Sequence, residues 1–331
     1  MRATLIAAPI DAAPAWGKVL IAGGMGVGNA PALSTTELYD PAANSFVAAA
    51  DTATMNTGRY FATATLLASG KVLIAGGETA GPTIDAVLSS TELYDPATNT
   101  FAPVSDTATM NTARVFATAT LLPSGKVLIA GGLGSGESTI LSSTELYDPA
   151  TNSFAPAANT ATMNSARFLA TATLLTSGKV LIAGGSGGAF LTSTELYDPA
   201  TNAFAPSADT AVMNFRRAEA TATLLASGKV LIAGGNNGEF FLTSTELYDP
   251  ATNTFAYLGD TATMNAGRIL ATATLLPSGE VLIAGGCCTL SSTELYDPAT
   301  NSFAAAADRS HERQSLQRDG DAFTLRKGAN R

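Results

Sequence analysis

The sequence predicts an all-β protein, a six-bladed β-propeller in which each blade is a sheet of four short antiparallel strands. Three observations lead to this prediction. An apolar segment that ends in two glycines, GKVLIAGG or GEVLIAGG, occurs six times. A second segment, TELYDPATN or a close variant followed by Phe, accompanies each copy. The copies are 50 to 55 residues apart, a period typical of propellers, solenoids and other repeat arrays.

The composition indicates a globular chain and argues against two classes of function. Hydrophobic residues make up 46% and charged residues 14%, so the chain can bury a core and does not resemble a disordered protein. The apolar runs of five or six residues are too short to cross a bilayer as a helix. Residues 1–304 contain 12 Lys+Arg and 23 Asp+Glu, and this acidic excess argues against a nucleic-acid partner.

The unit that begins at Arg114 shows why each inner strand is expected. The segment RVFATATLLPSG alternates small and larger residues and ends in turn-forming residues, so it predicts the first strand. The segment KVLIAGG is a short continuous apolar run with β-branched Val127 and Ile129, which is typical of a strand buried on both faces. The Gly131–Gly132 pair then ends that strand and permits close approach of a neighbouring backbone.

The outer half of the same unit predicts two further strands. STELYD alternates again, and residues 149–152, Pro-Ala-Thr-Asn, form a tight turn in which Asn accepts a left-handed conformation. Ser153–Ala155 is the short outer strand. A linear stack would need polar capping repeats at its ends, and none is evident, so the repeats are expected to close into a ring.

These motifs resemble the repeat of the kelch family. The inner strand is most similar to that of bacterial members, which often reads R-x-x-H-T-A-T-L-L, although this chain has Ala at the His position, at Ala62, Ala117, Ala170, Ala220 and Ala271. The resemblance rests on the Gly-Gly pair after an apolar strand, the Tyr of TELYDP and the aromatic residue that follows six or seven positions later. Kelch units usually carry Trp at that last position, where this chain has Phe46, Phe101, Phe154, Phe204, Phe255 and Phe303. The resemblance implies a propeller of the galactose oxidase and kelch type. It does not specify a function, because such propellers include enzymes, adaptors and scaffolds.

The predicted organisation is one propeller over residues 1–304 and a charged C-terminal tail over 305–331. The blade repeats are expected near 17–58, 59–113, 114–166, 167–216, 217–267 and 268–304. The first unit lacks an Arg-led inner strand; Ala3–Ile6 is the favoured source of that strand, and Phe323–Leu325 is the alternative. The tail holds the chain's single histidine, His311, and is expected to be disordered or to close the ring.

One face of the predicted propeller carries the candidate binding residues. The loop between the second and third strand of each blade varies from 6 to 13 residues, whereas the turns on the opposite face are nearly invariant. Function on repeat scaffolds concentrates where insertions differ. The candidates are Glu78, Asp85, Glu137, Phe190, Phe215, Arg216, Glu219, Asn236, Asn237, Glu239, Phe240 and Phe241. The alternative for the phenylalanines is that they fold down over the blade edge.

Most other charged residues recur in every unit and are therefore expected to be structural. The Glu of TELYD should pair with the Arg register that starts at Arg59, although a ring of arginines that binds an anion is the alternative. Glu219 replaces an apolar residue of other units, and Arg216 or Arg217 is expected to satisfy it. Cys287 and Cys288 are expected to be ordinary thiols, and a strained vicinal disulfide or a metal contact is the alternative. No catalytic residue, metal site or cofactor is predicted.

These observations lead to the hypothesis of a non-catalytic kelch-type scaffold that binds a protein or a glycan through the variable face. A carboxylate-dependent glycan-active enzyme is one alternative, and a structural fragment of a larger surface protein is another. A copper oxidase is not expected, because residues 1–304 contain no histidine. The chain is expected to be a monomer. An extracellular or cell-surface location is slightly favoured, although Asp11 and two prolines make the N-terminus a poor secretory signal.

Overall fold

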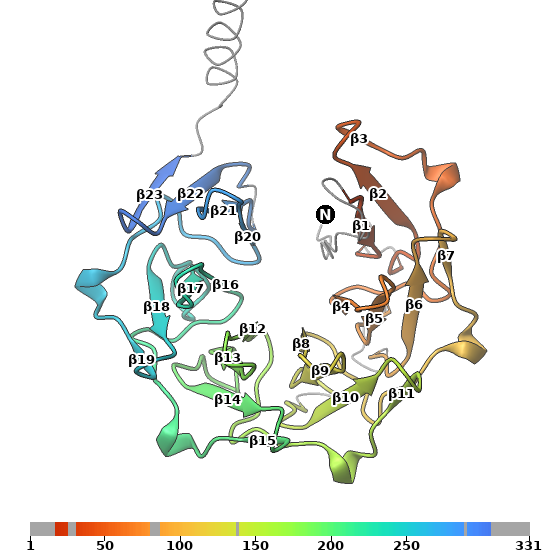
Figure 1. The fold of residues 1–331 in the computed structure, drawn as a ribbon, viewed down its shortest axis with the longest axis horizontal. Helices are drawn as coiled ribbons and strands as arrows, with labels where there is room; N and C mark the ends of the chain where they lie inside the picture. Colours follow the sequence, from red (N-terminus) through yellow and green to blue (C-terminus); the bar gives the residue numbers. More distant parts are fainter. Residues whose placement is uncertain (1–16, 26–30, 80–86, 137–138, 288–289, 306–331) are drawn as a thin grey trace, which may run out of the picture.

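The computed structural model describes residues 17–25, 31–79, 87–136, 139–287 and 290–305, which form six small sheets around a central axis (Figure 1). The sheets are antiparallel and follow one another along the chain, with no strand exchanged between them. The prediction of an all-β, six-bladed propeller is therefore confirmed. Within these residue ranges, no helix has the length and apolar character needed to cross a membrane.

Each blade corresponds to one sheet. Blade 1 contains β1 (Val19–Ala22), β2 (Thr36–Asp40) and β3 (Ser45–Phe46). Blade 2 contains β4 (Thr63–Leu66), β5 (Val72–Ala75), β6 (Thr91–Asp95) and β7 (Thr100–Phe101). Blade 3 contains β8 (Thr118–Leu121), β9 (Val127–Ala130), β10 (Thr144–Asp148) and β11 (Ser153–Phe154). Blade 4 contains β12 (Thr171–Leu174), β13 (Val180–Ala183), β14 (Thr194–Asp198) and β15 (Ala203–Phe204). Blade 5 contains β16 (Thr221–Leu224), β17 (Val230–Ala233), β18 (Thr245–Asp249) and β19 (Thr254–Phe255). Blade 6 contains β20 (Thr272–Leu275), β21 (Val281–Ala284), β22 (Thr293–Asp297) and β23 (Ser302–Ala305).

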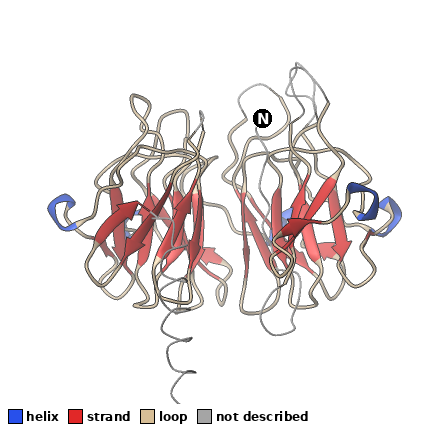
Figure 2. Cartoon of the chain, turned by 90° about the horizontal axis from the view of Figure 1, so that it is seen from above, coloured by secondary structure: helices blue, strands red, loops and turns tan. Residues whose placement is uncertain are grey.

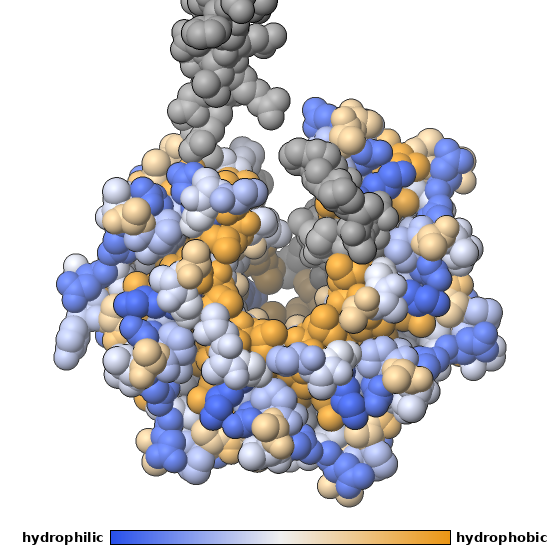
Figure 3. Space-filling view, viewed as in Figure 1, coloured by the Kyte–Doolittle hydropathy of each residue, from blue (hydrophilic) through white to orange (hydrophobic). Residues whose placement is uncertain are grey.

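Short 3₁₀ helices lie on the outer rim, in the connections between consecutive blades (Figure 2). They are η1 (Ala49–Asp51), η3 (Val104–Asp106), η4 (Ala157–Asn159), η5 (Ser207–Asp209) and η6 (Leu258–Asp260). The TATL strands form the inner wall of the ring, and the two-residue Phe strands of blades 2 to 5 lie outermost (Figure 1). The space-filling view shows hydrophobic residues around the central opening and hydrophilic residues on the rim (Figure 3).

Blade 1 has three described strands, and its innermost position is not occupied by any described residue. Glu37, which corresponds to the buried Glu92 of blade 2, is exposed in this blade. Both segments that were considered for the missing strand, Ala3–Ile6 and Phe323–Leu325, lie outside the described residues, as does the tail. The choice between the two therefore stays a prediction.

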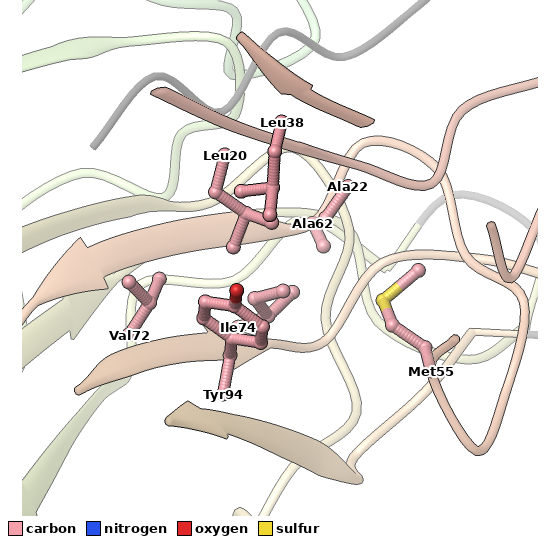
Figure 4. Close-up of a cluster of buried hydrophobic side chains, with 8 residues drawn as sticks. All are labelled: Leu20, Ala22, Leu38, Met55, Ala62, Val72, Ile74 and Tyr94. Atoms are coloured by element: carbon pink, nitrogen blue, oxygen red, sulfur yellow. The ribbon is translucent and has the colours of Figure 1, made fainter. Parts of the chain in front are cut away.

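The core lies between blades rather than within them. Side chains alternate along each VLIA strand, so Val72 and Ile74 pack toward blade 1 while Leu73 and Ala75 pack toward blade 3. Figure 4 shows the cluster between blades 1 and 2, where Met55 of the connecting segment completes the packing. Burial of each such aliphatic side chain contributes about 1.5–3 kcal/mol, which explains why this strand is apolar on both faces.

A buried carboxylate in each of blades 2 to 6 binds the segment that enters the blade from the preceding one. In blade 3, Glu145 accepts hydrogen bonds from Arg114 Nη2 (3.0 Å), the Thr112 amide (2.9 Å) and Asn111 Nδ2 (2.7 Å). Burial lowers the pKa of Arg114, and the charge of Glu145 opposes that shift. The predicted structural role of these residues is confirmed. The arginines are at most 2% exposed, so they do not form an anion-binding ring.

The Asn side chains of the DPATN turns join neighbouring blades by hydrogen bonds. Asn99 is left-handed, with φ of 52°, as its turn position requires, and its Oδ1 accepts the Tyr94 hydroxyl at 2.9 Å. Its Nδ2 donates to the Asp51 carbonyl of the preceding rim helix at 2.7 Å. The same amide therefore shapes the turn and joins two blades, which explains why every copy keeps Asn.

Candidate functional site

Three of the registers in which side chains vary between the units lie next to one another. The first, which we call the axial ring, contains Phe61, Phe116, Leu169, Glu219 and Leu270. The second is the residue before each of these: Tyr60, Val115, Phe168, Ala218 and Ile269. The third is the first residue of each variable loop: Glu78, Leu133, Ser186, Asn236 and Cys287. Together these fifteen residues form what we call the axial site.

The axial ring is a chain of backbone hydrogen bonds that passes from blade 2 to blade 6. The amide of Phe116 donates to the Phe61 carbonyl (3.3 Å), and that of Leu169 to the Phe116 carbonyl (3.1 Å). Glu219 and Leu270 continue the chain, each at 3.0 Å. All five residues are left-handed, with φ of 52° to 60°, a conformation that costs bulky L-residues roughly 1–2 kcal/mol. Backbone strain of this kind clusters at functional sites, and here it is retained in five blades. The axial ring is therefore a candidate site.

The second and third registers are bound directly to each other. Tyr60 and Glu78 exchange two backbone hydrogen bonds, at 3.1 and 2.9 Å, and blades 3 to 5 repeat the pattern. Gly77 makes this close approach possible, because a Cβ there would lie 2.8 Å from the Tyr60 carbonyl oxygen and its φ is +90°. The start of each variable loop is therefore held beside the axial ring.

One side of the axial site is aromatic. Ring centroids are 5.0 Å apart for Tyr60 and Phe61, 4.3 Å for Phe61 and Phe116, and 6.4 Å for Phe116 and Phe168. These distances are those of interacting aromatic pairs. Phe61, Phe116 and Phe168 are only half-buried, so blades 2 to 4 present a continuous aromatic ledge with accessible surface.

Two carboxylates border this ledge. Glu78 is hydrogen-bonded to the Tyr60 side chain; burial raises the pKa of Glu78, and the tyrosine bond opposes the rise. Burial and the neighbouring Glu78 raise the pKa of Tyr60. Glu219 is the one acidic member of the axial ring, on blade 5, where the other blades carry Phe or Leu. Asn236, the first residue of the adjacent loop, exchanges backbone hydrogen bonds with Ala218 beside it.

The other predicted residues of loop 5 mostly organise that loop. The Asn237 side chain accepts the amides of Glu239 (2.9 Å) and Phe240 (2.8 Å). Phe190 of the preceding blade lies against Gly238, where a Cβ would be 3.0 Å from the ring. Phe240 is 69% exposed, so it does not fold down over the blade edge.

Other predicted residues make contacts different from those expected, or lie outside the described residues. Arg216 pairs with Glu239 at 2.9 Å on the surface, and Arg217 pairs with the buried Glu246 at 3.1 Å. The two arginines predicted as partners of Glu219 therefore bond to other carboxylates. Phe215 is 39% exposed beside them. Asp85, Glu137 and Cys288 lie outside the described residues.

The aromatic ledge was not anticipated from the sequence. Tyr60, Phe61, Phe116 and Phe168 each lie within two residues of an invariant arginine, at the start of the segment that predicts the inner strand. The usable signal was their variability between two invariant neighbours, the Arg and the ATATLL segment. A groove of about 620 Å³ on the turn face, between blades 3 and 4, is a weaker candidate because Lys126, Lys179 and Asp198, which line it, recur in other units.

The described residues do not offer a recognisable metal centre. They contain no histidine, and among them no group of three or more His, Cys, Asp or Glu side chains converges on one point. A copper centre built on imidazole ligands is therefore not supported by this donor set.

Comparison with known proteins identifies a fold but not a family. No family model matches the chain, and no curated protein matches it. Among solved structures, a fungal alcohol oxidase described as showing catalytic diversity among the AA5 family, in complex with copper, superposes with a TM-score of 0.64. The two are 19% identical over 92% of this chain. The alignment covers 65% of the oxidase, so this chain spans less than two thirds of its length. The galactose-oxidase-like propeller fold is thereby supported.

This comparison corrects the hypothesis of a non-catalytic scaffold that binds proteins or glycans. A solved structure that shares the fold is that of a copper-containing alcohol oxidase, hence a catalytic protein. The hypothesis rested on explaining nearly every charged and aromatic residue as scaffold. The axial site shows that reasoning to be incomplete, because four aromatic residues and two carboxylates gather where no repeat-wide structural role requires them.

Proposed function

We propose that the axial site binds a small molecule that combines an apolar ring with an amine. The observation that carries this proposal is the convergence of the three variable registers on one end of the axis, with aromatic residues on blades 2 to 4 and a carboxylate on blade 5. Sites for small ligands are typically concave, mostly apolar and supplied with a few polar groups that set orientation.

The arrangement matches the two halves of such a ligand. The half-buried rings of Phe61 and Phe116 offer faces on which a planar apolar group can stack. Glu219 lies two positions further along the same hydrogen-bonded ring, where it can receive an ammonium group. Aromatic faces also attract cations, by roughly 0.5–2 kcal/mol. The acidic character of residues 1–304 favours approach of a cation over an anion.

Isothermal titration calorimetry with three related probes tests this proposal. Phenethylamine should bind more tightly than 2-phenylethanol, and phenylacetate should bind least, because all three carry a phenyl ring on a two-carbon chain but end in a cationic, a neutral and an anionic group. The change Glu219→Gln should weaken phenethylamine binding by roughly tenfold, which corresponds to about 1.4 kcal/mol. Phe116→Ala should weaken all probes that bind.

A matched control separates a local from a general charge effect. Glu239→Gln removes one carboxylate from the same face but from a loop residue that is 62% exposed and outside the axial site. Its binding of phenethylamine should equal that of the unaltered chain. Equal binding of the amine and the acid, or equal losses in the two glutamate variants, would contradict the proposal.

We also propose that the repeats are kelch repeats and that the chain lacks copper-dependent oxidase activity. The packing of Tyr147 on Phe154, with centroids 5.2 Å apart and repeated in each blade, supports the first point. The absence of histidine from residues 1–304 supports the second. Copper-loaded protein should release no hydrogen peroxide with primary alcohols, and peroxide release above a metal-only control would overturn this part of the proposal.

A further inference from the structure

Blades 1 and 6 each present an apolar face that the other blades bury. Hydrophobic clusters join every consecutive pair from blades 1–2 to blades 5–6, and among the described residues no cluster joins blade 6 to blade 1. Figure 1 shows these two blades apart. All four residues of β5 are buried, whereas Leu282 and Ala284 of β21, and Val19 and Ile21 of β1, are only half-buried.

The Gly-Gly pair of blade 6 is also left open. In the earlier blades, the second glycine donates its amide to the carbonyl of the next blade's arginine, as Gly77 does to Arg114 at 2.9 Å. The first glycine touches that same carbonyl: a Cβ on Gly76 would lie 2.3 Å from it. Among the described residues, a Cβ on Gly285 would meet no atom closer than the Leu290 carbonyl oxygen, at 3.8 Å. Blade 6 is therefore shaped to receive the arginine of a following repeat.

The amino-acid sequence of the tail is compatible with such a repeat in a different reading frame. Each codon can be regrouped by joining its last two bases to the first base of the next codon. If CAT-GAA encodes His311 and Glu312, the regrouped bases ATG-AA begin Met-Asn. If CGG-AAA-GGT encodes residues 326–328, the regrouped bases GGA-AAG-GT read Gly-Lys and begin Val. All 21 residues from His311 to Arg331 permit such a regrouping.

With suitable synonymous codons, the regrouped sequence is MNASRYSATATLLPSGKVLIA. It differs from residues 110–130, MNTARVFATATLLPSGKVLIA, at four positions only. The spacer between the Asp and the Met of the repeat gives the number of bases lost. Three residues, or nine bases, separate Asp260 from Met264, whereas seven bases separate Asp308 from the regrouped Met codon. A loss of two bases accounts for the difference.

We infer that residues 311–331 are a seventh repeat read out of frame, and that the open faces of blades 1 and 6 are the two sides of a slot for a seventh blade. In blade 2, Met110 packs against Gly76: a Cβ on Gly76 would be 3.1 Å from Met110 Cε. The Met of the seventh repeat would pack against Gly285 in the same way. Its Arg carbonyl would accept the Gly286 amide, and its VLIA strand would cover Leu282 on one side. Blade 1 would cover its opposite face.

The nucleotide sequence gives the first test. The inference requires CAT at His311, since CAC would replace the regrouped Met by Thr. It requires GAC at Asp319, since GAT would give Met in place of Thr. It requires GCT at Ala322, since no other alanine codon regroups to Leu. A different codon at any of these three positions would overturn the inference.

The second test restores the blade to the protein. Residues 1–308 are continued in the regrouped frame through a complete repeat that ends in TELYDPATNTF, and the product is compared with the unaltered chain. Amide hydrogen exchange in β21 and β1 should slow, and the melting temperature should rise. In a control, the added repeat carries Ser in place of the Val, Leu and Ile of VLIA, and neither change should occur. Equal protection in all three proteins, or protection in the unaltered chain through self-association that sedimentation detects, would contradict the seventh-blade slot.

Discussion

Replacing the buried carboxylate of blade 3 tests how much the Arg–Glu pairs contribute to the stability of the fold. Glu145 is 1% exposed and accepts four hydrogen bonds, among them one from Arg114, which is also 1% exposed. The change Glu145→Gln keeps the shape but replaces one acceptor oxygen by a donor that faces Asn111, Thr112 or Arg114. It also leaves the Arg114 charge buried without its anion.

The expected loss follows from that geometry. Breaking a buried ion pair by removing one partner costs about 3–5 kcal/mol. For a chain of 331 residues, such a loss corresponds to a fall in melting temperature of about 4–7 °C. Differential scanning calorimetry and urea unfolding measure both quantities. Changing Arg114→Met together with Glu145→Gln should cost less than the sum of the single changes, because the two residues share one network.

A surface pair in the same blade provides the control. Lys126 and Asp148 are 3.1 Å apart, but the lysine side chain is 42% exposed. Lys126→Gln should therefore cost less than about 1 kcal/mol, as surface ion pairs do. If Glu145→Gln lowered the free energy of unfolding no more than Lys126→Gln does, the buried carboxylate would not be what holds the segment entering blade 3, which would refute the role given to Glu145.

Two further predictions concern the stability of the fold at low pH and the effect of replacing glycine by alanine. Burial alone would raise the pKa of Glu294, but hydrogen bonds from Asn265, Arg268 and Ala266 outweigh it and leave that pKa below its usual 4.5. The stability this gives is present above pH 4.5 and is lost as pH falls through the lowered value; melting curves from pH 7 to 3 should show the loss, and Glu294→Gln should flatten it. Gly76→Ala should destabilise far more than Gly285→Ala, although both glycines have φ near 65°, because only the first would drive a Cβ into a neighbouring carbonyl. Equal losses in chemical denaturation would mean that the left-handed backbone alone sets the cost.

The elements of the fold were predictable because each carries a local signal. The VLIA strand is apolar on both faces because both neighbours bury it, and the Asn of DPATN is left-handed in the structure as its turn position requires. The Arg–Glu pairing also followed from the sequence, since the two residues recur together in blades 2 to 6. These signals depend only on neighbours in the repeat, and repetition makes each neighbour known.

The candidate site was predictable only in part. Glu219 stood out because it breaks an apolar register, and Glu78 because it opens a variable loop. The aromatic ledge did not stand out, because Phe61 and Phe116 belong to different units and meet only when blades are packed side by side. Phe240 attracted attention through its position in a loop, yet it lies outside the axial site and is largely exposed. The pairing of Arg216 with Glu239 likewise depended on how loop 5 folds.

The sequence by itself determined the blade: its strand order, its turns, its buried Arg–Glu pair and its repetition around an axis. These properties follow from residue patterns within one unit of about 50 residues, where strand periodicity and turn chemistry act locally. Only the tertiary structure decided which variable registers meet, because residues about 50 positions apart become neighbours through blade packing. It also decided that blades 1 and 6 keep open apolar faces, because the burial of a blade depends on what stands beside it.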